Sequence, residues 1–194
     1  VREEVEQGHR VFVVCPRIGD EPGGTDTGQE VGDEIDPDAG RPVSGEDEVS
    51  PDADEEPRQT ASVLDLARWL EEGPLVGIRV GILHGRMSPE DKDDTMRRFA
   101  DVDASDGLDV LVSTTVIEVG VDVPDATMMV VMDADRFGIS QLHQLRGRVG
   151  RGSLPGLCLL ITNAADGTPA RQRLAAVAST TDGFRLSDLD LELR

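Results

Sequence analysis

Short apolar runs alternate with amphipathic segments along most of the chain, a pattern typical of repeated strand–helix units. The apolar runs are rich in Val, Ile, Leu and Met and lack strict polar alternation, as expected of strands covered on both faces. They predict strands over 10–15, 78–83, 109–113, 127–132 and 157–161. The pattern therefore predicts an α/β fold in which a mainly parallel sheet lies between two layers of helices.

The segments between these strands have the features of helices. Apolar residues repeat at helical spacing from Val63 to Leu70, and this helix should end near Gly73. Ser88 and Pro89 are residue types of an N-cap and a first helical turn, so they predict a helix that continues to Ala100. Further helices are expected over 138–148, 169–178 and 186–193.

Residues 19–57 break this pattern because they contain almost no branched apolar or aromatic residues. They hold 15 acidic residues and one base, Arg41, of the 39 acidic and 19 basic residues in the chain. Such a segment buries too little apolar surface to offset the entropy of ordering, so we expect a disordered acidic insertion. An alternative hypothesis is that it mimics polyphosphate in a basic groove when DNA is absent. The other residues hold 24 acids and 18 bases, so the net charge of −20 does not exclude a nucleic-acid partner.

Length and cysteine usage narrow the class of protein further. The 194 residues suit one principal domain, and no apolar run approaches the roughly 18–20 residues that cross a bilayer. Cys15 and Cys158 lie in strand-like runs, and nothing is spaced for a metal site or a disulfide framework, which favours a reducing, cytoplasmic setting. The chain starts without Met and stops directly after the run 186–193, so we expect a fragment of a longer protein.

Glycines and arginines alternate in the segment QLRGRVGR at 144–151, at the end of a predicted helix. On a continuing helical turn Arg148 and Arg151 would share a face, and two guanidinium groups could bind one triphosphate. Gly147 and Gly150 would let a phosphate approach. The alternative is that these arginines complement the dipole of a helix C-terminus, and the segment alone does not decide between the two.

Hydroxyl side chains follow a predicted strand in the segment VSTTVIEVGVDVP at 112–124. Ser113 and Thr114 could bond a phosphate, and Asp122, eight residues further on, could accept a ribose hydroxyl. Capping by Thr115 and a turn at Asp122 explain the same residues, and the segment alone favours that interpretation.

Polar residues also follow other predicted strands, at the carboxyl edge where parallel sheets bind ligands. They include His84 and Gly85, although a lone histidine is at least as often a buried or capping residue. No Gly-Lys-Ser or Gly-Lys-Thr occurs in the chain, so a Walker A phosphate loop is absent.

Four segments, taken together and in order, resemble the second motor domain of the RecG-type helicases of superfamily 2. They are LHGRM at 83–87, STTVIEVGVDVP at 113–124, DRFG at 135–138 and QLHQLRGRVGRG at 141–152. Transcription-repair coupling factors are similar over the same stretch, but the residues of these segments match the RecG type better. The resemblance covers roughly 10–194 apart from the acidic insertion. It implies a RecA-like three-layer domain over 1–168, followed by the start of a C-terminal helical hairpin over 169–194, although these last helices could simply cover the sheet edge.

The resemblance also implies roles for individual residues. In such motors ATP lies between two RecA-like domains, and the first one carries the Walker A lysine and the Mg²⁺-binding acids. Arg151 would be the arginine finger, with Arg148 beside it on the γ-phosphate and Gln144 linking the site to the opposing domain. Asp122 would contact the ribose where Gly120 lets the backbone approach. A further group would face DNA: His84, Gly85, Ser113, Thr114 and Thr115.

The implied function of the complete protein is ATP-dependent remodelling of stalled replication forks and Holliday junctions. Its partners would be DNA, the first motor domain and a DNA-binding wedge domain, with no membrane. The 194 residues alone should not hydrolyse ATP, because they hold half of a nucleotide site. A transcription-repair coupling translocase and a non-catalytic nucleotide-binding module stay open as alternatives.

Overall fold

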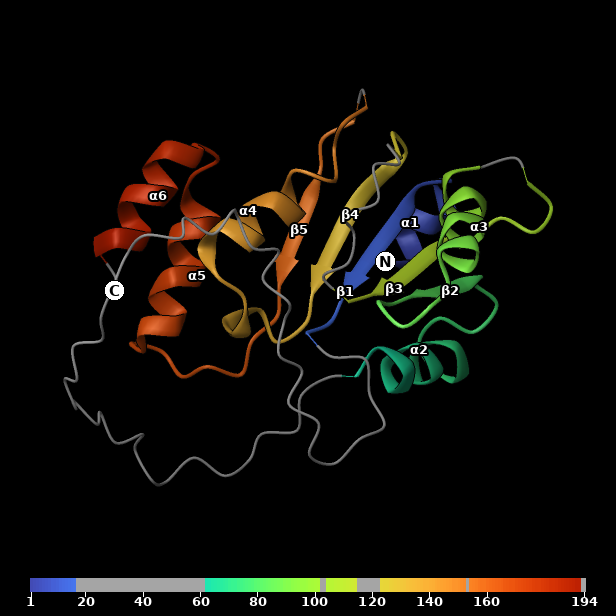
Figure 1. The fold of residues 1–194 in the computed structure, drawn as a ribbon, viewed down its shortest axis with the longest axis horizontal. Coiled ribbons are helices and arrows are strands. Elements are labelled where there is room, and N and C mark those ends of the chain that lie inside the picture. Colours follow the sequence, from blue (N-terminus) through green and yellow to red (C-terminus); the bar gives the residue numbers. More distant parts are fainter. Residues whose placement is uncertain (17–61, 102–103, 115–122, 153, 193–194) are drawn as a thin grey trace, which may run out of the picture. The chain divides into compact units, whose positions relative to one another are not determined.

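A computed structural model of the chain describes residues 1–16, 62–101, 104–114, 123–152 and 154–192. Its five-stranded sheet is parallel throughout, with the strand order β2-β3-β1-β4-β5 (Figure 1). The strands are β1 (Arg10–Val14), β2 (Val80–Leu83), β3 (Val110–Ser113), β4 (Ala126–Val131) and β5 (Leu157–Leu160). Each begins and ends within two residues of the predicted range, and the parallel α/β fold is confirmed.

The helices follow most of the predicted pattern. They are α1 (Arg2–Glu6), α2 (Val63–Glu72), α3 (Pro89–Ala100), α4 (Ile139–Arg146), α5 (Pro169–Ser179) and α6 (Gly183–Glu192), with a 3₁₀ turn η1 (Ala134–Arg136). The predicted N-cap of α3 is confirmed, since the Ser88 hydroxyl accepts a hydrogen bond from the Asp91 amide at 3.1 Å. The sequence does not predict α1, which has five residues and no side-chain cap. α6 begins three residues earlier than expected because the Asp182 carboxylate accepts a bond from the Phe184 amide at 3.0 Å.

Each face of the sheet carries its own apolar core. On one face Phe12 of β1 packs against Phe99 of α3, with ring centroids 4.8 Å apart, and α4, α5 and α6 complete this core. On the other face Val13 lies in a second core with Ala67 of α2, and Val5 of α1 packs against it. The sheet is therefore the middle of three layers, as expected.

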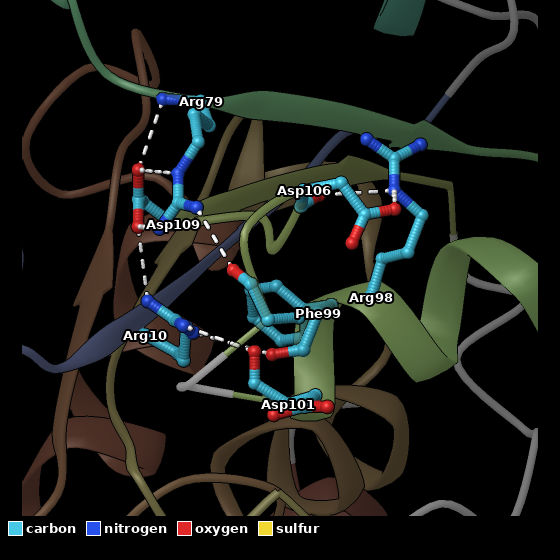
Figure 2. Close-up of polar contacts among 8 residues, drawn as sticks. Arg10, Arg79, Arg98, Phe99, Asp101, Asp106 and Asp109 are labelled. Carbon is cyan, nitrogen blue, oxygen red and sulfur yellow. Dashed lines mark hydrogen bonds and ion pairs between the residues drawn. The ribbon is translucent and has the colours of Figure 1, made fainter.

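An ion cluster joins the amino ends of three neighbouring strands (Figure 2). The Asp109 carboxylate accepts a bond from Arg10 Nη1 at 3.0 Å and from Arg79 Nη2 at 2.8 Å and Nε at 3.0 Å. Arg10 is 2% exposed, and its Nε also donates to the Phe99 carbonyl at 3.3 Å. Burial of the Asp109 carboxyl works to raise its pKa, but the hydrogen bonds and charge of Arg79 and the charge of Arg10 hold this pKa below its usual value.

Two predictions about organisation are not tested by these elements. Residues 19–57 lie outside the described residues, so the expected disorder stays a prediction, as does the division of the chain at residue 168.

Within the described ranges, no helix has the length and apolar character needed to traverse a membrane. The same ranges contain no group of three His, Cys, Asp or Glu side chains that could hold a metal ion.

Candidate functional site

Four of the expected DNA-facing residues, His84, Gly85, Ser113 and Thr114, gather at the carboxyl ends of β2 and β3. Leu83 pairs in register with Ser113, and the Thr114 amide donates to the Leu83 carbonyl at 3.2 Å. His84 and Gly85 directly follow Leu83. His84 and Gly85 therefore lie at the same edge of the sheet as Ser113 and Thr114, although roughly 30 positions separate the two pairs in the sequence.

Three polar atoms at this edge are buried and have no hydrogen-bond partner within the described part of the chain. They are His84 Nδ1, Ser113 Oγ and Thr114 Oγ1. Ser113 is 0% exposed and Thr114 5% exposed, so neither hydroxyl is open to a large ligand in this conformation. Because buried polar groups are nearly always bonded in folded proteins, three such atoms together mark a place where water, a ligand or a conformational change supplies partners.

Two cations lie close to His84. Burial, followed by the charges of Arg86 and Lys92, lowers the pKa of His84, so its ring is neutral at pH 7. Lys92 Nζ donates to the Gly85 carbonyl at 2.9 Å, and the His84 amide donates to Met87 Sδ at 3.4 Å, which fixes the turn before α3. A neutral His84 offers a phosphate a hydrogen bond but no charge. The charge at this edge comes from Arg86 and Lys92. Both lie near His84 because of the turn before α3, which the segment LHGRM at 83–87 does not reveal by itself.

The described members of the expected nucleotide-binding group, Gln144, Arg148 and Arg151, lie toward the opposite end of the sheet, near the amino ends of β4 and β5. Here the loop 147–156 connects α4 to β5 (Figure 1). The Gly150 amide in this loop donates to the carbonyl of Ala126, the first residue of β4, at 3.0 Å. Gln144 and Arg151 are exposed, and Arg148 is half-buried. Arg151 Nε donates to the Gly147 carbonyl at 2.8 Å, inside the same loop. The structure thus separates the two groups of predicted site residues.

The helical turn expected to carry both arginines is not formed, and this prediction was wrong. α4 ends at Arg146, and a last turn-like bond runs from the Val149 amide to the Arg146 carbonyl at 3.4 Å. Gly150 then adopts a φ of +71°, which a helix does not allow. This residue redirects the chain before Arg151, so Arg148 and Arg151 share a loop and not a helical face.

A third arginine of the segment, Arg146, has a structural role that the sequence does not reveal. Its Nη1 donates to the carbonyls of Val177 and Thr180, each at 2.7 Å, and its Nη2 donates to His143 Nδ1 at 2.9 Å. Arg146 therefore binds the carbonyl end of α5 to the end of α4. The alternative that Arg148 and Arg151 complement a helix dipole is not tested by these contacts of Arg146.

Three predicted site residues, Thr115, Gly120 and Asp122, lie outside the described residues. Pro124, two positions after Asp122, is described and packs against Gly152. A Cβ added to Gly152 would lie 2.7 Å from the Pro124 carbonyl oxygen. The chain just after Asp122 and the chain just after Arg151 are therefore neighbours.

Comparison with known proteins identifies the family to which this domain belongs. The sequence matches the helicase conserved C-terminal domain over residues 58–153. The ATP-dependent DNA helicase RecG of Mycobacterium leprae is 47% identical over 194 residues, which is 100% of this chain and 22% of that protein. The chain belongs to the RecG type of helicase C-terminal domain. Bacillus subtilis RecG is 37% identical over the whole chain and 23% of its own length.

A solved structure supports the same assignment for the RecG-type domain. The structure of RecG bound to a three-way DNA junction is 34% identical, with a TM-score of 0.66, over 100% of this chain and 20% of that one. The expected RecA-like fold of the second motor domain is thereby confirmed. The RecG-type chain spans about a fifth of the length of these relatives.

Proposed function

We propose that this RecG-type domain is the second motor domain of an ATP-dependent DNA helicase that remodels stalled replication forks and Holliday junctions. The main support is the loop 147–156, which carries Arg148 and the exposed Arg151 and is bonded to the first residue of β4. A loop held in this way can offer a guanidinium group to a phosphate on a facing domain with little loss of conformational entropy.

In this proposal ATP is bound mainly by the first motor domain, and Arg151 reaches its γ-phosphate across the cleft. Arg148 lies on the same phosphate, Gln144 contacts the opposing domain, and Asp122 and Gly120 receive the ribose. Mg²⁺ neutralises phosphate charge when bound, and its ligands are expected on the first motor domain. The proximity of Pro124 to Gly152 supports a common site for Asp122 and Arg151.

DNA is proposed to bind at the opposite edge of the sheet. His84, Gly85 and the hydroxyls of 113–115 would contact the sugar–phosphate backbone, and Arg86 and Lys92 would supply positive charge. The unbonded buried atoms of His84, Ser113 and Thr114 support this placement. Forked and four-way DNA, the first motor domain and a wedge domain are the proposed partners, in the cytoplasm.

The substitution Arg151→Ala in the complete protein tests the proposal. We expect DNA-stimulated ATP hydrolysis to fall by about 10³–10⁵-fold, because an arginine finger neutralises charge on the transferring phosphoryl group. Binding of a fluorescent ATP analogue should largely survive. Arg68→Ala, which removes an exposed arginine from α2, is the matched control and should hydrolyse ATP at the wild-type rate. Hydrolysis by Arg151→Ala at a rate near wild type would contradict the assignment.

A further inference from the structure

The edge strand β5 is unusually apolar and open. In the described sheet it pairs with β4 alone, and residues 157–161 contain neither a charge nor a proline. The other edge strand, β2, is half-buried or buried throughout, whereas β5 alternates exposed and half-buried residues. Natural sheets protect their edges with charges, prolines or a covering element, because unpaired backbone groups otherwise recruit further strands. An uncharged edge such as β5 therefore calls for a cover.

One face of β5 presents a row of large apolar side chains. Leu157, Leu159 and Ile161 are 48%, 38% and 43% exposed. Leu159 is paired with Val130 of β4, which packs against the core that α1 and α2 cover. This row thus extends an interior layer of the domain beyond the helices that shield it, which indicates that an apolar partner lies over it.

The other face of β5 borders a groove of about 560 Å³. Cys158 and Leu160 line it from the strand, and Leu174 and Val177 line it from α5. Burial raises the pKa of the Cys158 thiol, which keeps it uncharged and suited to an apolar contact. Both faces of the same edge therefore offer apolar contacts.

The backbone of β5 has bonding groups that point away from β4. The Ile161 amide donates to the Val131 carbonyl at 2.9 Å, so Ile161 and Leu159 direct their backbone groups toward β4. By the alternation of a parallel strand, the amides and carbonyls of Cys158 and Leu160 face the open edge. A strand that bonded to them would place its side chains alternately in the groove and over the leucine row. The occupant should therefore be an uncharged strand rich in Val, Ile or Leu on both faces.

We propose that an extended apolar segment of the complete protein, outside these 194 residues, pairs with β5 as a sixth strand. The chain is 22% of the length of its Mycobacterium leprae relative, so most of the polypeptide that could supply a cover lies elsewhere in the molecule. A segment of the same polypeptide acts at an effective concentration of about millimolar, which favours it over a second copy. This inference does not depend on the roles proposed for Arg151 or His84.

Hydrogen exchange in the complete protein tests this pairing. The amides of Cys158 and Leu160 should exchange as slowly as that of Met129 in β4, and dilution should leave their rates unchanged. Rapid exchange at both amides would overturn the proposal, because it would mean that no strand bonds to them. Protection that disappears on dilution would overturn it in favour of a second copy. This measurement on the unmodified protein does not depend on whether any variant folds.

A variant sharpens the same test. Leu159→Asp should speed exchange at Cys158 and Leu160 about tenfold or more by expelling the added strand, while Val13 in β1 keeps its rate. Val76→Asp is the matched control, because Val76 is 56% exposed and lies just after α2. It should leave exchange in β5 unchanged. Equal rates at Cys158 in wild type and Leu159→Asp would contradict the proposed apolar contact.

Discussion

A single carboxylate, that of Asp109, neutralises a buried arginine and joins the starts of three strands. Asp109→Ala would leave Arg10, which is 2% exposed, without its charge partner, and breaking a buried pair costs about 3–5 kcal/mol. Asp106→Ala is the control, because its ion pair with Arg98 joins side chains that are 67% and 36% exposed and is worth under about 1 kcal/mol. Urea unfolding at pH 7 measures both changes. Similar small losses in the two variants would contradict the structural role of Asp109.

The same residue gives this prediction a pH dependence. The pKa of Asp109 is lower in the folded chain than its usual value, so the ionised carboxylate favours folding. Its contribution is complete above the unfolded pKa of about 4 and is lost as pH falls through the lower folded pKa. Urea unfolding repeated from pH 7 downward should therefore show the difference between wild type and Asp109→Ala shrinking below about pH 4.

Pairings between distant residues explain what the sequence does not predict at this scale. Arg10 and Asp109 are 99 positions apart, and the carbonyls that Arg146 binds lie 31 and 34 positions away. No local pattern contains such partners. Ser88 caps its own helix three residues away, which is why its role is visible in the sequence.

The loop 147–156 owes its shape to two glycines whose backbones touch. Gly150 has a φ of +71°, and a Cβ there would lie 2.4 Å from the Gly156 amide nitrogen. Gly150→Ala should therefore cost more than the about 1–2 kcal/mol of a left-handed alanine, because a backbone contact must also open. Gly167→Ala is the matched control, since Gly167 has a φ of +85° and open space around its Cα. Urea unfolding gives the two free energies, and equal losses would contradict the contact.

The same pair of variants connects the loop to the proposed activity. Opening the contact with Gly156 would shift the loop that carries Arg151, whereas Gly167 lies in a different loop before α5. ATP hydrolysis by the complete protein should therefore fall in Gly150→Ala and stay at the wild-type level in Gly167→Ala.

Elements are predictable from the sequence where the deciding interactions are local. The strands and α3 follow from apolar runs and an N-cap, and they begin and end close to the predicted residues. The end of α4 does not follow from the sequence, because a helix can continue through a turn that contains glycine or stop there. The contact of Gly150 with Gly156 determines that α4 stops. The two site groups lie at opposite ends of the sheet for a related reason. The loop 147–156 leads into β5 and so lies at the amino end of that strand, whereas Ser113 ends β3 and His84 directly follows the end of β2.

At the scale of the whole molecule, the chain carries too few of the parts that phosphoryl transfer needs. Lys92 is the only lysine, and it donates to the Gly85 carbonyl at the edge of the sheet opposite to Arg151, so it cannot cradle the same phosphate. We therefore expect the 194 residues alone to release phosphate from ATP at the background rate, with or without four-way DNA. The complete protein is the positive control in the same assay. DNA-dependent turnover by the purified chain that Arg151→Ala abolishes would show that one domain holds a full site, and would contradict the proposal that ATP is shared with a second motor domain.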